Sequence, residues 1–152
     1  LHEAGHLVAG LLSGYRVVSF RVFNLMVVRR DDGLHFGRFS IAGTGGQCLM
    51  EPREQTLAEA EQMPYALYLA GGVVANALVS LVAIVVLAVG NAGVLCSCVM
   101  VMLALSGMYL AITNGVPMHI GGVANDGDNI RTLRRDHRAR QLLWVQLKVN
   151  AL

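Results

Sequence analysis

The chain has 152 residues, of which 55% are hydrophobic and only 14% are charged, and its formal net charge is +2. About a quarter of the residues of a typical soluble domain are charged, whereas residues 62 to 125 here contain no Asp, Glu, Lys or Arg. This distribution argues against an ordinary soluble domain, and we expect the lipid bilayer as a partner and no nucleic acid.

The first segment, residues 1–14, is apolar apart from its His and Glu residues and contains no proline. This pattern predicts the last turns of a membrane helix, which Gly14 ends. Because the chain begins at Leu1 without an initiator Met, we expect that a preceding segment is missing from the sequence.

Residues 15–63 predict a β-hairpin followed by a loop. Runs rich in Val and Phe, at 15–29 and 34–41, flank Asp32-Gly33, which is a hairpin signal. The remaining residues to position 63 are polar and predict a loop and a short surface helix. The hairpin could offer an edge strand to an extended substrate, or it could simply cover the membrane interface, and the sequence leaves both roles open.

Two apolar segments follow, at 66–89 and 94–113, and each is long enough to cross a hydrocarbon core of about 30 Å. The turn between them, at residues 90–93, makes an antiparallel helical hairpin. Residues 114–127 contain Pro117 and the pair Gly121-Gly122, so a regular helix cannot continue there. Irregular backbone at membrane depth needs protein or water around it.

The last segment, residues 128–150, predicts a basic interfacial helix, with Asp128 as its N-terminal cap. Its arginines are Arg131, Arg134, Arg135, Arg138 and Arg140. The positive-inside rule places this end of the chain in the cytoplasm. We therefore expect a multi-pass membrane protein whose C-terminus and active site both lie toward the cytoplasmic side.

These segments predict a single domain over residues 1–152. Its fold class is a mainly α, polytopic membrane protein with three core transmembrane helices. A β-hairpin is inserted between the first and second of these helices, and a basic interfacial helix ends the chain.

The sequence His2-Glu3-Ala4-Gly5-His6 is an HExxH motif. On a helix, residues four apart lie on one face about 6 Å apart along the axis, so His2 and His6 can bind one Zn²⁺. Glu3 lies beside that face and can activate a zinc-bound water. The alternative, two ordinary polar histidines, is weakened because ionisable groups within an apolar helix are costly and usually functional.

A catalytic zinc needs a third protein ligand and an open position for water. Asp126 follows the broken segment directly, where irregular backbone could aim its carboxylate at the metal. His119 and Asp128 are the alternatives. We expect His119 to be a polar residue near the membrane boundary or a minor contributor to substrate binding.

The arrangement resembles the site-2 protease family of intramembrane zinc metallopeptidases, from Leu1 to about Asn129. That family carries HExxH on one core helix, and later an NxxP pattern followed by an aspartate-glycine pair whose Asp is the third zinc ligand. The matching residues here are Asn114 and Pro117, then Asp126 and Gly127. The resemblance implies zinc ligation by Asp126 and a substrate-binding role for Asn114 and Pro117.

A further likeness is Gly72-Val-Val-Ala-Asn76, similar to the GxxxN pattern of the family's middle core helix. It implies that Asn76 hydrogen-bonds the broken segment or an unwound substrate, although a plain interhelical hydrogen bond is an equal alternative. The chain departs from the family pattern after the proline, because the aspartate comes later and within NDG in place of LDG.

We therefore expect a zinc-dependent metalloendopeptidase that hydrolyses a peptide bond in or near a membrane-spanning segment of a protein substrate. The rival interpretation is a catalytically inactive membrane homologue, or a metal-dependent transporter or binding protein. An inactive homologue would be expected to lose Glu3 or a ligand, and this chain keeps all four residues. Neither the substrate nor the oligomeric state can be named from the sequence.

Overall fold

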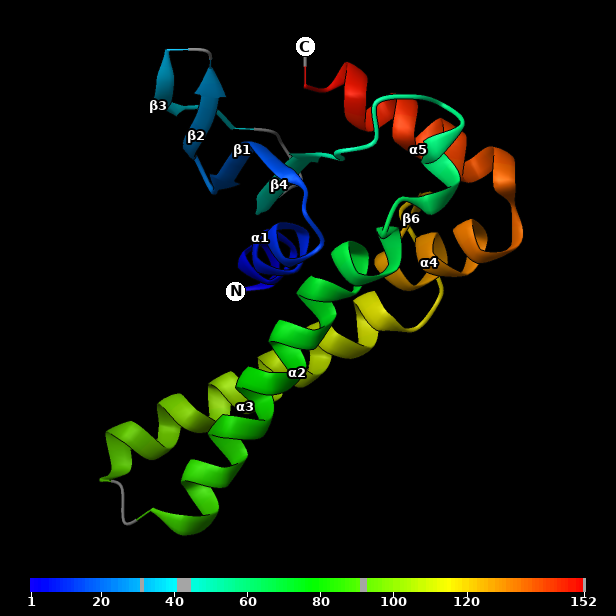
Figure 1. Ribbon diagram of the computed structural model, residues 1–152. Coiled ribbons are helices and arrows are strands. Elements are labelled where there is room, and N and C mark those ends of the chain that lie inside the picture. The colour runs from blue at the N-terminus through cyan, green and yellow to red at the C-terminus, as the bar shows by residue number, and fades with distance from the viewer. Residues whose placement is uncertain (31, 41–44, 91–92, 152) are drawn as a thin grey trace.

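The computed structural model describes residues 1–30, 32–40, 45–90 and 93–151. In chain order its elements are α1 (His2–Leu12), β1 (Arg16–Val22), β2 (Leu25–Arg30), β3 (Gly33–Arg38), β4 (Gly46–Glu51), the 3-10 helix η1 (Glu59–Gln62), α2 (Tyr65–Val89), α3 (Val94–Gly115), β5 (His119–Ile120), β6 (Val123–Ala124), α4 (Asp126–Arg135) and α5 (His137–Val149). A sheet lies beside α1, and the long pair α2 and α3 extends away from it, with α4 and α5 at one end (Figure 1).

The helices α2 and α3 lie side by side and run in opposite directions (Figure 1). They have 25 and 22 residues, which at 1.5 Å per residue is about 37 and 33 Å. By length and composition both could cross a membrane, and only 22% and 6% of their apolar windows are buried inside the protein. Most of their apolar side chains therefore face outward, as a lipid-exposed pair would require.

The predicted fold class, with three core transmembrane helices, is wrong. Among the described residues only α2 and α3 are candidate spans, because α1 has 11 residues and is only about 16 Å long. The helix ends where predicted, since Gly14 has a φ of +86° and its amide bonds to Leu11. A positive φ is easily adopted only by glycine.

The predicted β-hairpin is also too simple, because residues 16–51 form a four-stranded antiparallel sheet in the order β3-β2-β1-β4. The first predicted run is two strands, broken at Phe23, whose φ is +52°. Residues 46–51, predicted as loop, form β4 and pair with β1. This pairing buries Cys48 and Met50 on one face, a tertiary effect that the short polar segment did not signal. The end of the second predicted run, at Ile41, lies outside the described residues.

The predicted basic helix 128–150 is two helices, α4 and α5, separated by Asp136. Asp136 has extended backbone, and its side chain accepts a hydrogen bond from Arg138 N at the start of α5.

Upstream, α3 continues to Gly115, and the predicted broken segment contains a short hairpin, β5-β6. The predicted turn at 90–93 includes residues 91 and 92, which lie outside the described part of the chain.

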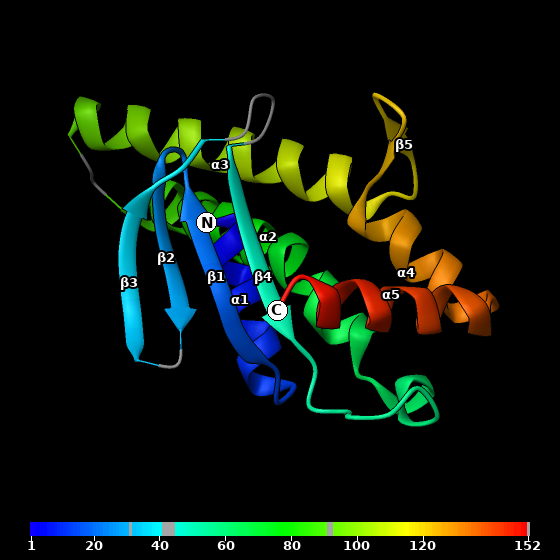
Figure 2. The same ribbon diagram turned by 90° about the horizontal axis from the view of Figure 1, so that it is seen from above.

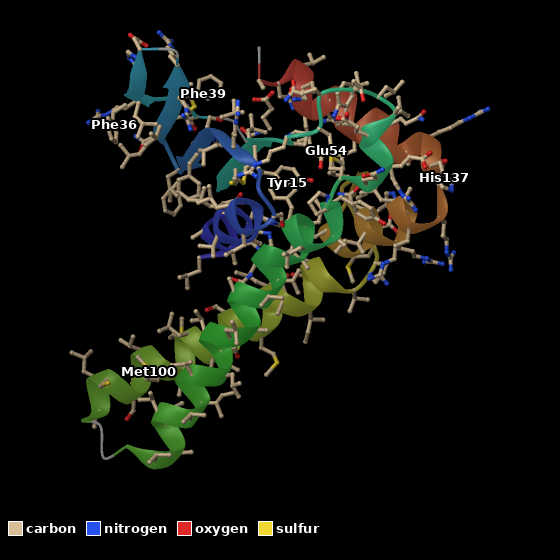
Figure 3. All side chains as sticks on the ribbon, in the orientation of Figure 1. Tyr15, Phe36, Phe39, Glu54, Met100 and His137 are labelled. Carbon is tan, nitrogen blue, oxygen red and sulfur yellow. The ribbon has the colours of Figure 1, made fainter. Side chains whose placement is uncertain are left out.

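The core lies where the sheet, α1, the start of α2 and the two C-terminal helices meet. Its buried members are Tyr15, Cys48, Met50, Met63, Tyr68, Leu69, Leu133 and Leu147. Figure 3 shows Tyr15 pointing into this core, where it stacks on Tyr68 at 5.0 Å, whereas Phe36 and Phe39 lie on the outer part of the sheet. The view from above shows α1 behind β1 and β4 (Figure 2), so the core holds α1 between the sheet and α2.

Candidate metal centre

The two histidines of the HExxH motif face the same point from α1. The Nε2 atoms of His2 and His6 are 3.1 Å apart, and the rings meet edge to face. Helical spacing over one turn accounts for this pairing. The prediction that both histidines lie on one helix face is confirmed.

Asp126, the first residue of α4, completes the group. Its Oδ2 atom lies 3.2 Å from His2 Nε2 and 3.4 Å from His6 Nε2, and the three side chains could hold a metal ion. Two ligand atoms bound to one zinc at 2.0–2.1 Å in tetrahedral geometry are about 3.3 Å apart. The three observed separations therefore match three edges of such a tetrahedron, with its fourth corner left for water or substrate.

The Oδ2 atom of Asp126 is buried and has no hydrogen-bond partner of acceptable geometry among the described residues, even though the two rings are close. Burial raises the pKa of the Asp126 carboxyl, but the adjacent His2 and His6 rings lower that pKa by more, so it lies below its usual range. A buried, ionised carboxylate needs a positive partner, which either a protonated imidazole or a metal cation in front of Oδ2 would supply.

The remaining ring nitrogens of both histidines are also engaged. His6 Nδ1 donates to the carbonyl oxygen of Tyr68 at 2.9 Å, which leaves its Nε2 lone pair for a metal. His2 Nδ1 lies 3.1 Å from the side-chain Nδ2 atom of Asn76, which in this orientation donates to it. An amide can place either its NH₂ or its oxygen at this position, and with the oxygen accepting, His2 Nε2 is likewise left free. Partners of this kind orient metal-binding histidines.

Glycines make the contact between α1 and α2 close enough for this geometry. A Cβ atom built on Gly72 would lie 2.5 Å from His2 Cε1 and 2.6 Å from His6 Nε2. Gly5 and Gly71 also meet backbone to backbone. The histidine rings therefore occupy the volume that a side chain at position 72 would need.

Glu3 lies beside the histidines in a cavity of about 760 Å³, lined by residues of α1, β1, α2, α3 and the start of β4. A Cβ atom on Gly46, the first residue of β4, would lie 2.6 Å from Glu3 Cγ. The backbone of β4 therefore sets where the Glu3 carboxylate can go. A carboxylate beside a metal position, within an open groove, is suited to proton transfer.

Of the three residues predicted to bind substrate, two line the cavity beside Glu3 and one packs against α4. Asn76 and Asn114 line the same cavity as Glu3, and Asn114 donates to the carbonyl of Leu110 within its own helix. Pro117 packs against the start of α4, since its N atom would lie 3.1 Å from a Cβ atom on Gly127. Asn76 contacts His2, and among the described residues it makes no side-chain hydrogen bond to the broken segment, which the resemblance had implied as one of its partners.

The two alternative ligands lie together and away from the histidines. His119 Nε2 is 3.6 Å from Asp128 Oδ2, and the His119 side chain is 62% exposed. Among the described residues, neither belongs to the group that could hold a metal. The predicted capping role of Asp128 is wrong, because Asn125 caps α4 and accepts a hydrogen bond from Asp128 N.

Sequence reasoning missed three contributors to the site: the Tyr68 carbonyl, Gly46 and Asn125. It named Gly72 only as part of the GxxxN pattern. A backbone carbonyl leaves no trace in the side-chain pattern. The Gly45-Gly46 pair and the Asn125-Asp126 pair were the available signals for the other two.

Comparison of the chain with family models, with curated proteins and with solved structures gave no match.

Proposed function

We propose that the chain is a zinc-dependent endopeptidase that cleaves a membrane-spanning protein segment, and that its resemblance to the site-2 protease family reflects membership. The observation that carries the proposal is the convergence of His2 Nε2, His6 Nε2 and Asp126 Oδ2 at 3.1, 3.2 and 3.4 Å. The HExxH motif favours Zn²⁺ over other cations for this set of two imidazoles and one carboxylate.

A zinc ion bound there would lower the pKa of a coordinated water to about 7 and polarise the scissile carbonyl. Glu3 would accept a proton from the attacking water and donate it to the leaving amine. Tyr68 and Asn76 would hold the two imidazoles in the ligating tautomer and orientation. The cavity beside Glu3 would receive the substrate.

The substrate would have to lose its helical structure before cleavage, because a helix keeps its carbonyls in internal hydrogen bonds. The cavity supports an extended segment, since its lining combines apolar side chains of α3, such as Leu103 and Leu110, with the backbone of Gly45 and Gly46. Apolar side chains suit a membrane-derived peptide, and β4, which begins at Gly46, is an edge strand of the sheet, as strand addition requires.

In this proposal α2 and α3 both cross the membrane, with α4 and α5 on the cytoplasmic side. The exposed arginines of these two helices support that orientation. Gly72, which touches both histidine rings, is seven residues into α2, or about 10 Å along the helix axis. The metal site would then lie within the cytoplasmic half of the bilayer.

The test is the zinc content and the peptidase activity of the purified chain in lipid nanodiscs, beside its Glu3→Gln variant. We expect about one zinc per chain in both proteins and cleavage of a transmembrane peptide by the unaltered chain alone, since Glu3 moves protons and does not bind the metal. Glu61→Gln is a matched control, because Glu61 pairs only with the exposed His137 among the described residues.

The possible results distinguish the proposed protease from a non-catalytic metal-binding protein and from other roles of Glu3. An unaltered chain that binds no zinc would overturn the proposal. Zinc binding without cleavage of any transmembrane peptide would favour the non-catalytic alternative. Full activity in the Glu3→Gln variant would remove Glu3 from the mechanism, and loss of zinc from it would make Glu3 a ligand.

A further inference from the structure

The spacing between Pro117 and Asp126 raises a structural question. In the family pattern the aspartate follows the proline sooner, whereas residues 118–125 intervene here. The structure folds this longer connection into the β5-β6 hairpin, with His119 opposite Ala124 and Ile120 opposite Val123. Its turn is Gly121-Gly122, whose φ angles of +60° and +83° suit glycine.

Asn125 closes the base of this hairpin. Its backbone N donates to the carbonyl of Met118 at 3.1 Å, and its side-chain Oδ1 accepts from Met118 N at 3.2 Å. The two ends of the connection are thereby held together, so the chain returns to the end of α3 before α4 begins.

The same side chain reaches two further elements. Its Oδ1 atom also accepts from Asp128 N at 2.9 Å, and its Nδ2 atom donates to the carbonyls of Thr113 at 2.7 Å and Val116 at 2.6 Å. Two donated and two accepted bonds use the whole hydrogen-bonding capacity of an asparagine amide. Asn125 is 8% exposed, and it joins the end of α3, the hairpin and the first turn of α4.

We propose that Asn125 is the positioning residue of the metal centre: it fixes the start of α4 to the end of α3 so that Asp126 faces His2 and His6 in spite of the longer connection. The inference rests on the proposed zinc site. Asp126 is the next residue, and its backbone position follows directly from that of Asn125. The fit of Gly127 against the Gly115 carbonyl brings the same two helix ends into contact.

A simple helix cap is the competing explanation, and it accounts for only one of the four side-chain bonds, the one to Asp128 N. Asn, Asp and Ser are about equally good N-caps. If capping were the whole role, Asn125→Asp and Asn125→Ser would both keep it. Neither variant keeps the two bonds donated by Nδ2, and Asp would set a carboxylate oxygen against two carbonyl oxygens.

The experiment measures zinc affinity of the full chain in nanodiscs by competition with a chelator, the visible absorption of the Co²⁺-loaded protein, and thermal unfolding of the metal-free protein. We expect Asn125→Asp and Asn125→Ser to weaken zinc binding by about tenfold or more and to change the cobalt spectrum, which reports the ligand geometry. The matched control is Asn129→Ser on the same helix, whose amide makes a single bond of 3.4 Å to Ala124, and we expect it to bind zinc like the unaltered chain.

The outcomes are distinguishable. Unchanged affinity and cobalt spectrum in both Asn125 variants, with zinc bound by the unaltered chain, would overturn this inference and leave the proposed function standing. An unaltered chain that binds no zinc would overturn both. Unfolding of both variants in the metal-free state would also overturn the inference, because Asn125 would then hold the whole fold and not the position of one ligand.

Discussion

The histidine rings are held from the side that faces away from the metal position. Tyr68 contributes a backbone carbonyl and Asn76 a side-chain amide, so only the second contact can be removed by substitution. Asn76 is 2% exposed, and its nearest described partner is the ring of His2. Its energetic effect should therefore appear mainly in metal binding.

We predict that Asn76→Ala weakens zinc binding by about tenfold, the lower end of the range for such outer partners. The measurement is chelator competition. Ser80→Ala is the matched control, since Ser80 is buried on the next turn of the same helix and donates to Ala104 without touching either histidine. An equal loss of affinity in both variants would show that packing of α2 and α3, and not the contact with His2, is responsible.

Gly72 provides a steric test of the same site. A methyl group there would overlap both rings, at 2.5 and 2.6 Å, so Gly72→Ala should displace the two histidines and release the zinc, with a loss of affinity of about a hundredfold. The metal content after dialysis checks this expectation. Gly37→Ala, at a position with nothing within 4 Å of the added atom, should keep its zinc. Retention of zinc by the Gly72 variant would mean that the rings do not sit as described.

At the scale of elements, β4 meets the cavity beside Glu3 at its N-terminal end. Its first residue, Gly46, touches the Glu3 side chain, whereas the preceding Gly45 has no atom within 4 Å of an added Cβ. Both glycines line the cavity. Substitutions at Gly46 and Gly45 can therefore distinguish displacement of the Glu3 carboxylate from simple crowding of the cavity.

We predict that Gly46→Ala lowers turnover by about a hundredfold, the lower range for loss of a positioned acid-base group, while the zinc content stays the same. Gly45→Ala should change neither. Turnover and zinc content of the two variants provide the check. If Gly45→Ala were as inactive as Gly46→Ala, crowding of the substrate and not displacement of Glu3 would be the cause.

Elements that depend on local interactions along the chain were predicted from the sequence, whereas a strand that depends on a distant partner was not. The boundaries of α2 and α3 were predicted within two residues, because a long apolar run bounded by Pro or Gly is a local signal. The pairing of His2 with His6 is equally local. By contrast, β4 depends on its partner β1, so it was not visible in a single segment. The break at Asp136 has a local signal, a capping aspartate, that the prediction overlooked.

The failed prediction of a third core transmembrane helix has a related cause. Residues 1–12 are apolar apart from His2, Glu3 and His6. In the structure α1 packs against the sheet on one side and α2 on the other, while Val8, Leu11 and Leu12 remain exposed. Apolar composition alone therefore did not distinguish an 11-residue helix beside a sheet from part of a membrane span. For the candidate metal site, the sequence named the three residues that the structure brings together, yet it could not show the hydrogen bonds by which Asn125 joins α3 to the start of α4.

At the scale of the whole molecule, charge and apolar surface lie at opposite ends. Within the described residues, α4 contacts both α2 and α3, and α5 packs against α4 and places Arg140 over the Tyr65 ring at the start of α2. The far end of the pair carries no charged residue (Figure 1). This asymmetry defines an orientation if α2 and α3 cross a bilayer.

We predict that a reporter fused after the last residue lies in the cytoplasm and that one inserted after Gly90 lies on the other side. Accessibility of the two reporters to a membrane-impermeant reagent tests this topology. Replacing Arg134 and Arg135, both exposed, with glutamate should weaken the orientation preference. The reverse labelling pattern in the unaltered chain would place the metal site on the opposite side of the membrane.

The metal centre joins the first turns of α1 to the first turn of α4, and α2 and α3 lie between them in the chain. During synthesis, which proceeds from the N-terminus, His2 and His6 leave the ribosome long before Asp126. The complete ligand set cannot form until both apolar helices have been made. A nascent chain would therefore carry an incomplete candidate site, and under the proposed function neither zinc binding by the full ligand set nor hydrolysis could begin before α2 and α3 had been synthesised.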